Sequence, residues 1–180
     1  MSQIKVNSIV PVGGLPGGAS SGGIIQVVST VSTATAAMTL GGGSGNSSWF
    51  DISGMSCTIT PQSASSKIFL MCVLRGAASG GYLGVQLVRA STAIMLGTGA
   101  TGSMSNVTGK FKARDSVHHT YEWVGNGIDS PNTTSATTYK VQVANRHSTE
   151  AFYYNRPSTL DDSNYTMYTS SSFTVMELTN

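Results

Sequence analysis

The chain has 180 residues and a net charge of +2, and only 10% of its residues are charged. A chain of this length buries roughly 70% of its extended surface on folding, so it needs neither a disulfide framework nor a structural metal. Its ten Lys and Arg residues are spread thinly along the sequence and form no basic stripe, so we expect no nucleic-acid partner.

The composition favours an all-β domain. The chain contains 27 Ser, 21 Thr and 21 Gly residues. Thr favours strands, whereas Gly and Ser favour turns. No run of 18 apolar residues and no N-terminal signal region occurs. We therefore expect a protein that is made in a cytoplasm and that neither inserts into a membrane nor leaves through a cleaved signal.

The first 23 residues differ from the rest of the chain. A short apolar segment is followed by a Gly-rich stretch, residues 13–23, with the composition of a flexible linker. The segment carries five apolar residues: Ile4, Val6, Ile9, Val10 and Val12. Such a segment is too short to fold alone, so we interpret residues 1–23 as an extended attachment peptide with its linker, which docks on a partner protein. A disordered tail, or one that packs on its own domain, is the alternative.

Residues 24–180 contain short alternating segments separated by turn signals. The predicted strands cover residues 24–29, 49–52, 55–60, 67–74, 83–88, 93–96, 117–124, 139–144, 152–155 and 171–178. Ser53-Gly54 and Asn126-Gly127 are interpreted as breaks between strands. About ten short strands at this spacing indicate a β-sandwich, and we predict a jelly roll.

Segment 67–74 is apolar on both faces, and so is the terminal segment 171–178. A strand that is apolar on both faces must be covered on both, yet one sandwich covers only one. The sequence therefore predicts a homotrimer. The predicted interface contains Phe69, Met71, Val73, Phe173 and Val175.

No motif points to catalysis, a metal or a cofactor. His118 and His119 are predicted on a strand, where they would point to opposite faces and could not share a metal. Asp161-Asp162 offers too few oxygens for Ca²⁺. No nucleophile elbow, phosphate loop or zinc pattern occurs, so we expect no enzymatic activity.

Two further residue sets have two interpretations each. Cys57 and Cys72 lie in apolar segments and are predicted to be buried thiols, with a disulfide as the alternative. Four tyrosines gather near the C-terminal third: Tyr153, Tyr154, Tyr165 and Tyr168. They form either a receptor-binding surface for a sugar or protein, or part of the core or subunit interface.

Several segments resemble a family of small fibre proteins of marine bacteriophages. The similar segments are residues 4–11, 23–28, 49–55, 59–68, 87–94, 129–132, 139–142 and 172–178. The domain is also similar to trimeric jelly rolls such as C1q and tumour-necrosis-factor domains.

The resemblance implies a virion structural protein: a surface knob of a tail fibre or head decoration that is held by its N-terminal peptide. It also implies contact with other virion proteins and, during host adsorption, with a glycan or protein on the host surface. A secreted C1q-like module that binds carbohydrate or protein is the alternative, against which the missing signal region argues.

Overall fold

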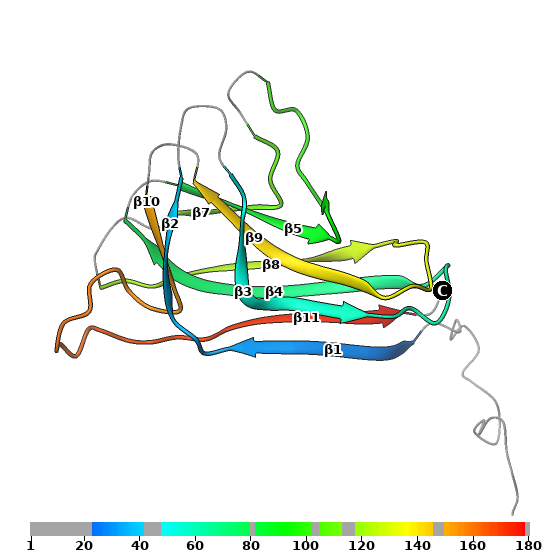
Figure 1. The fold of residues 1–180 in the computed structure, drawn as a ribbon, viewed down its shortest axis with the longest axis horizontal. Helices are drawn as coiled ribbons and strands as arrows, with labels where there is room; N and C mark the ends of the chain where they lie inside the picture. The colour runs from blue at the N-terminus through cyan, green and yellow to red at the C-terminus, as the bar shows by residue number, and fades with distance from the viewer. Residues whose placement is uncertain are drawn as a thin grey trace, which may run out of the picture.

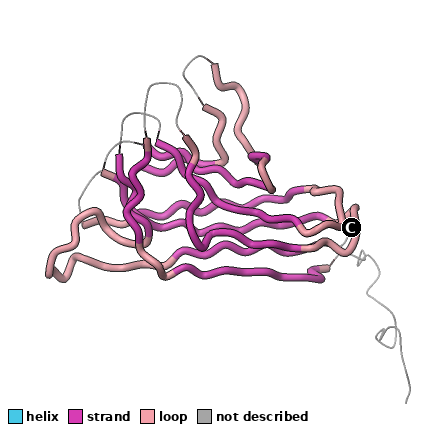
Figure 2. Tube along the Cα trace, in the orientation of Figure 1, coloured by secondary structure: helices cyan, strands magenta, loops and turns pink. Residues whose placement is uncertain are grey.

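The computed structural model describes residues 23–41, 48–79, 82–101, 105–112, 118–145 and 150–178 (Figure 1). Within these ranges the chain forms eleven strands in two antiparallel sheets and no helix (Figure 2). The all-β prediction is therefore confirmed. The predicted attachment peptide and linker lie outside the described residues, apart from Gly23.

Sheet 1 contains β1 (Ile24–Ser32), β2 (Ala36–Leu40), β4 (Lys67–Ala78), β8 (Tyr121–Asp129), β10 (Glu150–Tyr154) and β11 (Ser171–Leu178). Sheet 2 contains β3 (Phe50–Ile59), β5 (Tyr82–Arg89), β6 (Thr92–Ile94), β7 (Gly109–Lys112) and β9 (Thr137–Asn145). Four strands are ordered β1-β11-β4-β8 in one sheet and four are ordered β3-β9-β5-β7 in the other. This interleaved order makes the fold a jelly-roll β-sandwich, as predicted.

The core lies between the two sheets. Ile68, Leu70, Cys72 and Leu74 of β4 alternate inward and have no exposed surface. Val85 and Leu87 of β5, and Val141 and Val143 of β9, face them from sheet 2 and are equally buried. Each such side chain contributes about 1.5–3 kcal/mol by leaving water, so this interior is the main source of stability.

Both glycine-containing pairs that were interpreted as strand breaks lie inside strands. Gly54, with a φ of 78°, sits in a register shift of β3 between Asp51 and Ser56. This β-bulge bends the strand without ending it. Gly127 pairs with Leu70 within β8, where an added methyl group would lie 2.5 Å from the sulfur of Met95. Gly127 therefore serves close packing, and the predicted turn at Asn126-Gly127 is wrong.

Two short strands were not predicted from the sequence. β2 is rich in Ala and β7 contains two Lys residues, and both residue types are depleted in strands. Their partners hold them in place, since β2 pairs with β10 and β7 pairs with β5. β8 also begins later than expected, at Tyr121, and continues to Asp129.

A buried asparagine joins the strands where sheet 1 changes partners. β4 pairs with β11 as far as Val73 and with β10 from Gly76 onward. Figure 1 shows β2 and β10 turning away from the direction of β1 and β11 at this point. Asn155, directly after β10, has no exposed surface and a φ of 54°.

The Asn155 side chain donates to the carbonyl oxygens of Ser32 (2.8 Å) and Ala34 (2.9 Å) after β1. Its Oδ1 accepts from the Ser171 hydroxyl (2.6 Å) at the start of β11. The Ser171 hydroxyl in turn accepts the N–H of Arg75 in β4 (2.9 Å). A lost partner would leave buried groups unpaired at about 1–3 kcal/mol each. Asn155 therefore ties together the end of β1, the end of β10 and the start of β11, and through Ser171 it also reaches β4.

We predict that Gly76→Ala lowers the free energy of unfolding by about 1–3 kcal/mol. A methyl group there would meet the Tyr153 carbonyl oxygen and lie 2.7 Å from a Phe152 ring carbon. Gly41→Ala is the matched control, because nothing lies within 4 Å of its added methyl group. Urea unfolding at one protein concentration measures both variants. Equal stability of Gly76→Ala and Gly41→Ala would contradict the packing argument.

Candidate functional site: an apolar sheet face and a loop pocket

The outer face of sheet 1 carries apolar side chains on four adjacent strands. Directly paired residues of antiparallel strands share a face. The register places three rows side by side: Val27, Met176, Phe69 and Ile128; then Ser29, Thr174, Met71 and Asn126; then Val31, Ser172, Val73 and Val124. These twelve residues define the outer face of sheet 1. Val27, Val31, Val124 and Ile128 are each more than half exposed, and Met71 is 40% exposed.

The outer face of sheet 2 is polar by contrast. Gln86 donates to Gln142 (2.6 Å), and Gln142 donates to the Asp51 carboxylate (2.6 Å). Lys140 donates to the same carboxylate (2.8 Å), and the hydrogen bonds from Lys140 and Gln142 lower the pKa of Asp51. One face of the sandwich is therefore suited to water, whereas the other presents contiguous apolar side chains of the kind that marks an interaction surface.

Three of the predicted interface residues lie on the outer face of sheet 1: Phe69, Met71 and Val73. Phe173 and Val175 are fully buried between the sheets, so their assignment to a subunit interface is wrong. The error concerns which alternate residues of β11 point into the core. Ser171 points inward to Asn155, so every second residue after it also points inward.

The sequence reasoning missed the contributions of β1 and β8 to this face. Val124 and Ile128 alternate along β8, but interpreting Asn126-Gly127 as a turn hid the pattern. Val27 and Val31 alternate in the same way along β1. The period of two was present in both segments and could have revealed the face.

Charged side chains bound the face at both ends, and each has a partner. Arg75 donates to Glu122 (2.7 Å) and to the carbonyl oxygen of Ser170 (2.7 Å). At the opposite end, Lys67 donates to the Ser130 hydroxyl (2.8 Å). These charges lie at the two ends, whereas the middle row contributes Met71 between neutral polar side chains, two of which, Ser29 and Thr174, share a hydrogen bond (2.7 Å). An apolar surface with charged side chains at its edge resembles an interface with a polar rim.

A pocket of about 460 Å³ lies beside the loop from residue 155 to 170. It is lined by His118, His119, Thr120, Tyr165 and Met167. The two histidines precede β8, so their predicted placement on opposite faces of a strand is wrong, and both line this pocket.

The four predicted receptor tyrosines do not form one surface. Tyr165 and Tyr168 are 70% and 61% exposed on the loop between β10 and β11. Tyr154 is buried in the core, so its assignment to a receptor surface is wrong. Tyr153 is half-buried beneath the guanidinium of Arg156, which lies 4.8 Å from the ring centre. The loop pair is thus the part of the set that a ligand could reach.

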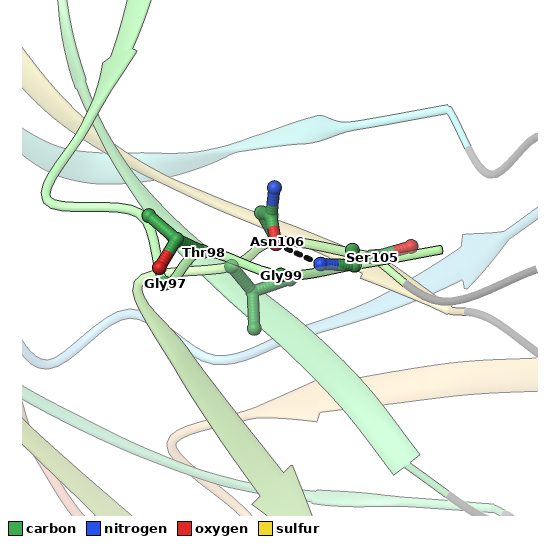
Figure 3. Close-up of a pocket in the computed structure, with 7 residues that line it drawn as sticks. Gly97, Thr98, Gly99, Ser105 and Asn106 are labelled. Carbon is green, nitrogen blue, oxygen red and sulfur yellow. Dashed lines mark hydrogen bonds between the residues drawn. The ribbon is translucent and has the colours of Figure 1, made fainter. Parts of the chain in front are cut away.

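A smaller pocket of about 250 Å³ lies between residues 97–100 and 105–107 (Figure 3). The N–H of Ala100 donates to the side-chain oxygen of Asn106 (3.1 Å) across it. The residues that line it are small or polar, and none carries a charge. We assign it no function.

A hydrogen-bonded carboxylate joins the two sheets. Asp129 of β8 accepts two hydrogen bonds from Arg89 (2.9 and 2.8 Å) and one from the Tyr139 hydroxyl (2.8 Å). Burial, followed by the hydrogen bond to Asp129, raises the pKa of Tyr139. The three side chains satisfy one another's hydrogen-bonding groups. Their arrangement is that of a structural link between the two sheets.

Both cysteines are buried free thiols, as predicted. The Cys57 thiol donates to the carbonyl oxygen of Phe173, and Cys72 pairs with Phe173 across β4 and β11. Burial raises the pKa of Cys72 to about 12 and also raises that of Cys57, so neither is a reactive thiolate near neutral pH. Over the described ranges, no group of three or more His, Cys, Asp or Glu residues could hold a metal. The same ranges contain no helix that is long and apolar enough to cross a membrane.

No protein-family model matches the chain, and a search of curated proteins finds no match.

We predict that Ile128→Glu separates the subunits without unfolding them. Ile128 is 58% exposed in one subunit, so the change should alter its own stability by no more than about 0.5 kcal/mol. In a covered face the same carboxylate would be buried without a partner, which is costly. Ser56→Glu, on the polar outer face of sheet 2, is the control.

Sedimentation velocity measures this effect. The wild type and Ser56→Glu should sediment as trimers, and Ile128→Glu as an 18.7 kDa monomer. A trimer of unchanged stability for Ile128→Glu would rule out this part of the face as the interface.

Proposed function

We propose that this chain is a structural protein on the surface of a bacteriophage virion. It forms a trimeric jelly-roll knob of a tail fibre or head decoration, is held to the particle by residues 1–12, and contributes to host adsorption. The observation that carries this proposal is the apolar outer face of sheet 1. Soluble monomers rarely present contiguous apolar surface of this kind, whereas subunits of assemblies do.

The contrast between the two outer faces supports self-association. The row of Asp51, Gln142 and Gln86 on sheet 2 is linked by hydrogen bonds, so its polar groups are already paired within the subunit. On sheet 1, eight of the twelve residues of the outer face are apolar, and Val31 and Ile128 among them are more than half exposed. A copy of the same chain around a threefold axis would cover this face, and the likeness to trimeric jelly rolls favours three copies over two.

The proposed role is that of a scaffold and binder rather than an enzyme. Fold alone does not determine function, so function has to be inferred from the side chains at particular sites. The charged groups described above serve structure: Arg89 and Asp129 tie the sheets, while Arg75 and Glu122 bound the apolar face. A jelly roll of this kind is a common architecture for viral capsid and binding domains.

We predict that deleting residues 1–20 leaves a folded trimer that no longer joins the virion. Three peptides on one trimer would bind to the particle at the same time, so three weak contacts give firm retention through high effective concentration. Deleting residues 14–18 is the matched control, because it shortens the linker and keeps the apolar segment.

Mass spectrometry of purified particles measures the copy number. The copy number of the truncated protein should fall by at least about a hundredfold, while that of the linker-deletion variant should stay near the wild-type level. Normal incorporation of the truncated protein would refute the hypothesis that the N-terminal peptide is the anchor. It would mean that the sandwich itself attaches to the particle.

A further inference from the structure

The pocket beside the loop from residue 155 to 170 lies at the end of the domain opposite the N-terminal entry. β1 begins at Ile24, which pairs with Leu178, and Leu178 pairs with Lys67 at the start of β4. Tyr121, directly after the pocket residues, pairs with Gly76 near the other end of β4. Figure 1 shows the loop before β11 projecting from that far end. A particle attached through the N-terminal segment would therefore point this pocket outward.

The side chains around the pocket combine an aromatic ring with polar groups. Tyr165 is 70% exposed, and its ring centre lies 6.3 Å from that of His118. An exposed aromatic ring offers a flat apolar surface, while the exposed His119 imidazole and the Thr120 hydroxyl can donate and accept hydrogen bonds. Among the residues that the structure describes, those that line the pocket include no Lys or Arg.

Hydrogen bonds hold the loop in place beside the pocket. The Tyr165 N–H donates to the Ser163 hydroxyl (3.3 Å), and the Thr166 hydroxyl donates to the Asp161 carboxylate (2.7 Å). Hydrogen bonds from Thr166 and Ser163 lower the pKa of Asp161, which therefore stays ionised. Its carboxylate lies 3.6 Å from Nδ1 of His118. A site ordered before binding loses less entropy when a ligand arrives.

We propose that this pocket binds one neutral hexose ring of a surface polysaccharide, with the C–H face of the sugar against Tyr165. The volume of about 460 Å³ falls within the range of small-ligand pockets, about 300–1,000 Å³. A pyranose has one apolar face and a rim of hydroxyl groups, which matches an aromatic ring flanked by His118, His119 and Thr120. This inference deepens the proposed role in host adsorption and rests on it for the source of the glycan.

Saturation-transfer NMR on the full chain tests the proposal with methyl glycosides of glucose, galactose, mannose and N-acetylglucosamine. A single ring against one aromatic face should bind in the millimolar range, so each is tested at about 10 mM. At least one of the four glycosides should receive saturation transfer from the protein. Tyr165→Ala should weaken that binding roughly tenfold, whereas Tyr165→Phe, which keeps the ring, should retain it.

Tyr82→Ala is the control, because it removes another exposed aromatic ring, on sheet 2, and should leave binding unchanged. The thermal midpoint of Tyr165→Ala should match the wild type, since its side chain is mostly solvent-exposed. No transfer to any of the four glycosides, or equal transfer with Tyr165→Ala, would overturn the proposal. Binding to host cells that survives periodate but not protease would overturn it in favour of a protein receptor. Particle incorporation does not involve the pocket, so the virion proposal could stand if sugar binding failed.

Discussion

The fold depends on a central strand, β4, that is apolar on both of its faces. Its inward residues Ile68, Leu70, Cys72 and Leu74 are covered completely by sheet 2. Its outward residues extend an apolar surface across β1, β11 and β8 that no other part of the described chain covers. Each Å² of that surface gains about 25 cal/mol when it leaves water, so the same physical effect that builds the core favours association through this face.

A single buried side chain connects this sheet to the loop that carries the pocket. Asn155 opens the loop and Ser171 closes it, and the hydrogen bond between them is 2.6 Å long. The same asparagine holds the end of β1 through Ser32. The apolar face and the loop are thus positioned by one polar junction, and the loop can present Tyr165 without losing order at its base.

The alternation of apolar residues in segments 67–74 and 171–178 was enough to predict the strands and the sandwich, because a period of two is a local property. What could not be read locally was the role of particular residues. Gly127 resembles a turn residue until Met95 is seen packing against it from a distant segment. The inward direction of Phe173 depends on Ser171 meeting Asn155, and the burial of Tyr154 depends on the whole core. The pocket needed two segments far apart in sequence.

The central claim is that other copies of the chain cover the outer face of sheet 1, and methionine oxidation tests it directly. Met71 lies at the centre of that face and is 40% exposed in one subunit, while Met167 on the loop is 64% exposed and serves as the internal reference. Limited peroxide treatment followed by peptide mass spectrometry gives both rates. The account predicts that Met71 oxidises at least about tenfold more slowly than Met167, as a buried methionine would. Comparable rates for the two residues would show that the face is open to water and contradict the account.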